Sequence, residues 1–122
     1  MTKNVKLNSY LEKLSIFGDV VAKPMFGGYG IYFEGLMFSL FAFDTLYFKV
    51  DKQTIDEFKS KKQKPFVYLG KPGAPVEMNY FTIPKAAWKE ASDLKVWFAM
   101  ATQASKRAAA KKKPKKVIKV LK

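Results

Sequence analysis

The side chains that most often carry catalysis at neutral pH are missing from this sequence, which contains neither histidine nor cysteine. Histidine is the commonest general base and metal ligand, and cysteine supplies the thiolate nucleophile. Ten carboxylates are present, but most fall at predicted turns, helix caps or exposed helix faces, and none has the spacing of a catalytic pair or a metal site. The sequence therefore predicts a protein that is not an enzyme and that binds no cofactor and no metal.

Positive charge is concentrated at the C-terminal end of the chain. Nine of the 23 Lys and Arg residues lie in residues 106–122, which contain no acid, whereas residues 1–105 hold the other 14 together with all ten acids. Lysines neutralise phosphates through counterion release, while only one Arg is available to read base edges, so nucleic-acid binding is expected to be non-specific. The residues predicted to bind nucleic acid are Lys106, Arg107, Lys111, Lys112, Lys113, Lys115 and Lys116. The alternative is a segment that only solubilises the chain.

The glycine-rich segment Gly27-Gly28-Tyr29-Gly30 is the second candidate for a binding site, as a phosphate-binding loop. A dinucleotide-binding loop requires a third glycine at the position of Phe33 and a helix beginning there, but a strand is predicted instead. The Gly-Lys-Ser/Thr of a Walker loop is also absent. We therefore predict that these glycines permit a positive φ or a β-bulge where the chain enters the sheet.

Hydrophobic periodicity and turn residues predict an α+β fold. The predicted elements are a helix over 5–17, a strand over 20–22, strands over 31–33, 36–43 and 46–50, a helix over 53–62, strands over 66–69 and 76–83, a short helical segment over 84–88 and a helix that starts at Ser92. Two-residue breaks at Glu34-Gly35 and Asp44-Thr45 indicate hairpins. The expected architecture is a two-layer sandwich, with an antiparallel sheet and helices on one face, in the order α-β(3–4)-α-β(2)-α.

Several boundaries are predicted from single residues. Gly18 is expected to end the first helix in the left-handed conformation, and Lys23-Pro24 to end the first strand. Thr54 and Glu57 have the spacing of a capping box, and Ser92 is expected to cap the last helix. Because proline cannot continue a helix, fraying is expected from about Lys111 onward. The domain is therefore assigned to residues 1–105 and the tail to residues 106–122.

The strand over 36–43 is apolar on both faces apart from Ser39. One face can pack on a helix, but the other needs cover from more of the chain, a protein partner or a second subunit. A homodimer is the expectation we favour. No apolar run approaches the roughly 18 residues of a membrane helix, so no membrane partner is expected. The lack of cysteine favours a cytoplasmic location.

Two stretches resemble the TfoX N-terminal domain family. They run from Lys23 to Tyr32, which includes Met25-Phe26-Gly27-Gly28-Tyr29-Gly30, and from Asp44 to Val50, which reads Asp-Thr-Leu-Tyr-Phe-Lys-Val. Further similar stretches are Gly35-Leu36-Met37-Phe38, Pro65-Phe66-Val67-Tyr68 and Met78-Asn79-Tyr80-Phe81-Thr82-Ile83-Pro84. The likeness covers about residues 7–105.

The resemblance implies a bacterial protein with a two-layer fold related to secretion-chaperone-like domains, which are often dimeric. It also implies that Met25, Phe26, Gly27, Gly28 and Gly30 determine the fold and do not bind a ligand. Longer members of the family regulate natural competence as transcriptional co-regulators and carry a second, C-terminal domain. This sequence has only the lysine-rich segment in that position.

Three functional hypotheses follow. The first is a small, non-catalytic regulatory module, related to transcription or competence, that associates with nucleic acid through its basic tail. The alternative is a protein-interaction or dimerisation module that uses an aromatic sheet face and has no nucleic-acid role. A third, an enzyme or ligand carrier, requires a deep pocket with a buried carboxylate, lined by Tyr29, Tyr32, Tyr47 and Tyr68.

Overall fold

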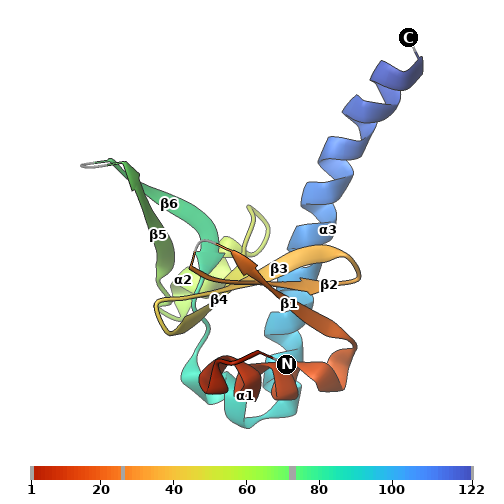
Figure 1. Cartoon of the computed structure of the whole chain (residues 1–122). Helices are drawn as coiled ribbons and strands as arrows, with labels where there is room; N and C mark the ends of the chain where they lie inside the picture. Colours follow the sequence, from red (N-terminus) through yellow and green to blue (C-terminus); the bar gives the residue numbers. More distant parts are fainter. Residues whose placement is uncertain (1, 26, 72–73, 122) are drawn as a thin grey trace.

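Six antiparallel strands form one open sheet in the order β1-β2-β3-β4-β6-β5, with helices packed on it (Figure 1). The computed structural model describes residues 2–25, 27–71 and 74–121, without the side chains of 68–71, 74–77 and 112–121. The elements are α1 (Val5–Leu14), η1 (Ser15–Phe17), β1 (Val20–Met25), β2 (Gly28–Phe33), β3 (Leu36–Ala42), β4 (Thr45–Lys49), α2 (Ile55–Ser60), β5 (Pro65–Lys71), β6 (Ala74–Phe81), η2 (Lys85–Lys89) and α3 (Ala91–Leu121). The predicted α+β class and element order are confirmed.

The main core lies between the sheet and the three helices. Leu7, Leu11 and Leu14 of α1 recur every three or four residues and are buried as one stripe. Phe58 of α2 joins the same cluster, as do five residues of β2, β3 and β4. The core-facing stripe of α3 consists of Leu94, Trp97, Phe98, Ala101 and Ala104, which are all buried.

A β-bulge in β3 changes which of its side chains point toward the main core. The pairing of β2 with β3 shifts between Ile31, which faces Ser39, and Tyr32, which faces Met37. Because Phe38 is the extra residue, Phe38 and Phe41 both reach the main core, although they are three positions apart. The Ser39 hydroxyl is fully buried there and donates a 2.7 Å hydrogen bond to the carbonyl oxygen of Tyr47.

The chain itself covers part of the second sheet face. A smaller cluster of Leu40, Ala42, Phe66 and Tyr80 packs there, on the side toward which the β5–β6 hairpin rises from the plane of β3 and β4 (Figure 1). Burial raises the pKa of Tyr80 to about 12, with a smaller contribution from Tyr32, so the phenol stays neutral in this cluster. Of the alternatives that the sequence left open, cover by another part of the chain is therefore observed on this part of the face.

The predicted hairpin at Glu34-Gly35 is confirmed, and both residues have positive φ, of 53° and 80°. The next hairpin is displaced by one residue from the predicted Asp44-Thr45, because Phe43 and Asp44 form the turn with φ of 51° and 62°. A turn with two positive φ values disfavours the β-branched Thr45, which begins β4 instead.

Two further boundaries in this region were predicted wrongly. Strand β1 does not end at Lys23-Pro24 but runs to Met25, with Pro24 opposite Tyr29. Proline is tolerated there because β1 is an edge strand and needs ladder bonds on one side only. Gly18 has the expected positive φ of 145°, but with ψ of −177° it is extended and not left-handed helical.

The predicted helix caps also need correction. Thr54 makes no capping hydrogen bond to α2, because its hydroxyl accepts the Asp51 N–H at 3.0 Å instead. Helix α3 begins at Ala91, one residue before Ser92, and the Leu94 N–H donates to the carbonyl of Glu90.

Helix α3 does not fray at Lys111, contrary to the prediction, but continues through Pro114 to Leu121. A proline inside a helix removes one backbone hydrogen bond, while the alanines and lysines around it are strong helix formers. In Figure 1, the C-terminal part of α3 projects away from the sheet, so the basic segment extends the last core helix.

Candidate nucleic-acid interface

A bidentate ion pair fixes the point where α3 leaves the domain. The Arg107 Nε and Nη2 atoms donate to the two carboxylate oxygens of Asp51 at 2.6 and 3.0 Å. Asp51 lies two residues after the end of β4 and also accepts the backbone N–H of Gln53 at 3.0 Å. The hydrogen bonds from Arg107 are the main cause that lowers the pKa of Asp51, and the same contact raises the pKa of Arg107. Both side chains are about 30% exposed or less, so the pair is partly shielded from water.

Lys106 is held against the domain as well. Its Nζ atom lies 3.2 Å from the Glu34 carboxylate in the β2–β3 turn, and both side chains are more than half exposed. The predicted set of binding residues therefore has two parts. Lys106 and Arg107 form ion pairs with acidic residues of the domain. The lysines for which no such ion pair is described begin at Lys111.

A groove of about 370 Å³ lies at this junction. Its lining includes four cationic side chains, Lys49, Lys52, Arg107 and Lys111, and one acidic side chain, Asp51. Lys49 lies over the Tyr80 ring, with its Nζ 5.1 Å from the ring centroid. The positive surface of the C-terminal helix thus continues onto the domain at the end of β4.

The remaining predicted residues, Lys112, Lys113, Lys115 and Lys116, lie in the helical C-terminal part of α3, where their side chains are outside the described set. Helical periodicity places positions 111, 112, 115, 116 and 119 on one side of the helix, because residues four apart are neighbours. At 1.5 Å per residue, positions 111–119 span about 12 Å. A lysine stripe of this length can follow several phosphates of a nucleic-acid backbone.

The glycine motif has a structural role wherever it is described. A Cβ atom on Gly28 would lie 2.1 Å from the carbonyl oxygen of Phe41, and one on Gly30 would lie 2.6 Å from the Met25 sulfur. Gly27 has a φ of 75° in the β1–β2 connection, so the expectation of a positive φ is met there. Phe26 lies outside the described residues. The motif therefore allows β1, β2 and β3 to pack closely.

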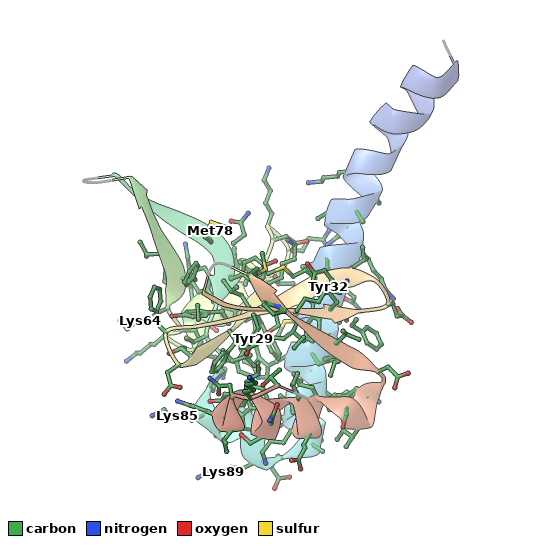
Figure 2. The ribbon with its side chains drawn as sticks, viewed as in Figure 1. Tyr29, Tyr32, Lys64, Met78, Lys85 and Lys89 are labelled. Atoms are coloured by element: carbon green, nitrogen blue, oxygen red, sulfur yellow. The ribbon has the colours of Figure 1, made fainter. Side chains whose placement is uncertain are left out.

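The tyrosine-lined pocket of the third hypothesis is not formed by the described residues. Tyr29 and Tyr32, labelled in Figure 2, are three positions apart in β2 and lie on opposite faces of the sheet. Tyr29 packs on the main core and Tyr47 on the smaller cluster, while the side chain of Tyr68 is outside the described set. Among residues of described burial, the buried polar ones are Ser39, Thr54, Thr102 and Ser105, with no carboxylate.

The part of the chain that the structure describes contains neither a metal-binding cluster nor a membrane-spanning helix. No group of three or more acidic side chains is placed to hold a metal ion. No helix there has the length and apolar character needed to cross a membrane.

A sequence model of the TfoX N-terminal domain matches residues 12–105. The chain belongs to the TfoX N-terminal domain family. This family is linked to competence regulation. A comparison with curated proteins finds no match.

The matched TfoX N-terminal domain ends at Ser105, directly before the two anchoring residues Lys106 and Arg107. Sequence reasoning did not find the domain residues that receive them, Glu34 and Asp51. Glu34 lies at a predicted hairpin, and the Arg107–Asp51 pair, separated by 56 positions, leaves no local signal in a single sequence. Only the isolated arginine among many lysines was a hint, since arginine favours bidentate pairing with a carboxylate.

Proposed function

We propose that this protein is a non-catalytic regulatory module that associates with nucleic acid, without sequence preference, through the basic C-terminal part of α3. The observation that carries the proposal is the placement of the charge. Nine basic residues and no acid follow position 105, and those up to Lys119 lie in the continuation of a core helix that is anchored by the Arg107–Asp51 pair.

The anchoring makes the segment better suited to binding than a free tail. A flexible lysine tail loses conformational freedom when it binds, whereas a helix already in place loses less. Lysine-rich segments bind through phosphates and release counterions, which gives affinity without reading bases. A competence-related regulatory role follows from the family and is part of the same proposal.

The experiment compares the full chain with a variant in which five lysines of the helix become glutamine. The changes are Lys111→Gln, Lys112→Gln, Lys113→Gln, Lys115→Gln and Lys116→Gln, and glutamine preserves helix propensity. The matched control carries five Lys→Gln changes on the domain, at Lys13, Lys23, Lys59, Lys89 and Lys95, all of which are exposed. Fluorescence anisotropy with two unrelated DNA duplexes should show strong loss only for the helix variant. Equal loss in both variants, or a clear preference for one duplex, would reject the proposal.

One observation favours a second candidate function, a protein-contact module. Phe43 is 83% exposed in the β3–β4 turn and stacks on Phe66, with ring centroids 6.1 Å apart. Val67, the residue after Phe66 on the edge strand β5, is 42% exposed. An exposed aromatic residue in a turn with positive φ is a plausible anchor for a partner or a second copy. Sedimentation of the wild type and Phe43→Ser tests this: a dimer that dissociates in the variant supports it.

A further inference from the structure

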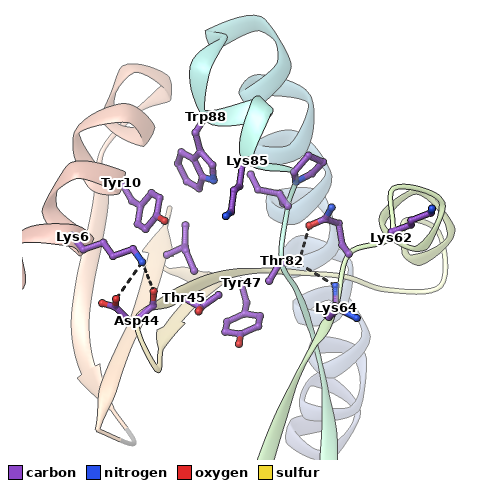
Figure 3. Close-up of a pocket in the computed structure, with 14 residues that line it drawn as sticks. Lys6, Tyr10, Asp44, Thr45, Tyr47, Lys62, Lys64, Thr82, Lys85 and Trp88 are labelled. Atoms are coloured by element: carbon purple, nitrogen blue, oxygen red, sulfur yellow. Dashed lines mark hydrogen bonds and ion pairs between the residues drawn. The ribbon is translucent and has the colours of Figure 1, made fainter.

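A cleft of about 610 Å³ opens between α1, η2, strand β4 and the connection between α2 and β5 (Figure 3). Its lining includes the lysines Lys6, Lys62, Lys64 and Lys85 and the aromatic residues Tyr10, Tyr47 and Trp88. We call it the lysine cleft. Figure 1 shows α1 at the opposite end of the molecule from the C-terminus of α3, so the cleft is separate from the helical lysine stripe.

The charge of the lysine cleft favours an anionic ligand. Among the described residues that line it, Asp44 is the only acid, and that carboxylate is paired with Lys6 at 3.2 Å. In the described part of the chain, Lys62, Lys64 and Lys85 form no ion pair. Three positive charges without acidic partners therefore surround a concave surface.

Aromatic rings supply the second requirement. Tyr10 and Trp88 contact each other with centroids 4.5 Å apart, and Trp88 also meets the buried Phe48 edge to face at 6.0 Å. These contacts hold the indole in place, while Tyr10, Tyr47 and Trp88 each remain partly exposed. In Figure 3, Lys85 extends into the space between this pair and Tyr47.

We propose that the lysine cleft binds single-stranded nucleic acid, with a base against Trp88 or Tyr47 and the adjacent phosphates at Lys64 and Lys85. Aromatic side chains combined with lysines are the general means of binding unpaired strands, because every base has a face that can stack. A duplex buries those faces and cannot use the rings. The inference goes beyond the proposed function, since it gives the domain a site that does not depend on the C-terminal helix.

The rim of the cleft is supported well enough to keep its shape. The Lys64 N–H donates to the Thr82 hydroxyl at 3.0 Å, and that hydroxyl donates to the Gln63 side chain at 2.8 Å. On the other side, Lys6 Nζ donates to the carbonyl oxygen of Asp44 at 2.8 Å and links α1 to the β3–β4 turn. A site held this way loses little freedom when it is occupied.

The test uses the fluorescence of Trp88 in the full chain. The two tryptophans are Trp88 and Trp97, and Trp97→Phe leaves Trp88 as the only indole. Oligothymidylate and oligouridylate are added to this protein, to a Lys64→Ala/Lys85→Ala variant, and to a control Lys59→Ala/Lys95→Ala variant with the same loss of charge. Thermal unfolding confirms that all three proteins fold.

Both oligonucleotides should quench Trp88 in the parent and in the control, and a preference between them identifies DNA or RNA as the better ligand. The Lys64→Ala/Lys85→Ala variant should bind at least about tenfold more weakly. Its slope of log K against log salt should be less steep by about 1.4, which corresponds to two phosphate contacts on a single strand. Loss of one stacking ring, in Tyr47→Ala, should weaken binding about five- to 150-fold.

Three results would overturn the inference: equal weakening in both lysine variants, quenching by duplex DNA as strong as by single strands, or displacement of the oligonucleotide by polyglutamate at equal charge concentration. The last would assign the cleft to an acidic protein segment. Binding by the C-terminal helix is measured separately, through duplex anisotropy. Failure there rejects the proposed function and leaves the cleft result standing.

Discussion

The Arg107–Asp51 pair should contribute measurably to the stability of the domain, although it lies near the surface. The perturbation is Arg107→Met, which keeps the aliphatic stem and removes the guanidinium, together with Asp51→Asn and the double variant. With side chains 30% and 26% exposed and two hydrogen bonds of 2.6 and 3.0 Å, the pair falls between two known classes. Exposed pairs contribute about 0.2–1 kcal/mol, and breaking a buried pair costs about 3–5 kcal/mol.

We therefore expect a coupling energy of about 1–2 kcal/mol from the double-mutant cycle, measured by urea unfolding. Arg107→Met alone should lower the free energy of unfolding by a similar amount, and the melting temperature by about 3–8 °C. The matched control is Lys106→Met, which breaks the exposed pair with Glu34 and should cost less than about 0.5 kcal/mol. A coupling energy below about 0.3 kcal/mol would refute the view that this pair anchors α3 to the domain.

Three other outcomes follow from the structure. Gly28→Ala should destabilise the domain by about 3 kcal/mol or more in urea unfolding, since its Cβ would lie 2.1 Å from the backbone oxygen of Phe41, and a loss below about 1 kcal/mol would contradict the packing described. Because the pKa of Asp51 is lowered from 3.8, its stabilising effect is present above that pH and lost as the pH falls through the lower, folded-state value. The free energies of unfolding of the wild type and Arg107→Met should therefore converge as the solution becomes acidic. A difference that stays constant with pH would contradict a stabilising role of the ionised Asp51. Pro114→Ala should leave the helical circular dichroism at low temperature nearly unchanged, because α3 already continues across that position, and a clear increase would contradict a helix across Pro114.

The elements with strong periodicity could be predicted from the sequence. The apolar stripes of α1 and α3 and the alternating strand β4 lie where their spacing placed them, because burial of one face decides these structures. The boundaries were less predictable, since neighbouring residues compete for the same role. Thr54 has the right spacing for a helix cap, yet its hydroxyl instead forms hydrogen bonds with the backbone of Asp51.

The candidate sites were predictable only in part. Composition alone located the lysine-rich segment, and the proline argument then ended its helix too early. The lysine cleft combines residues from α1, the β3–β4 turn, β4, the α2–β5 and β6–η2 connections and η2, which are separated by up to 82 positions between Lys6 and Trp88. No local pattern in one sequence can bring these residues together, because their proximity depends on the strand order and on the packing of η2.

The salt dependence of duplex binding decides whether the C-terminal helix holds nucleic acid by its lysines. If five phosphates are neutralised, the slope of log K against log salt should be about −4.5, and it should approach zero in the variant with glutamine at positions 111–113, 115 and 116. A slope near zero in the wild-type protein, or a steep slope that survives these substitutions, would contradict the proposed function.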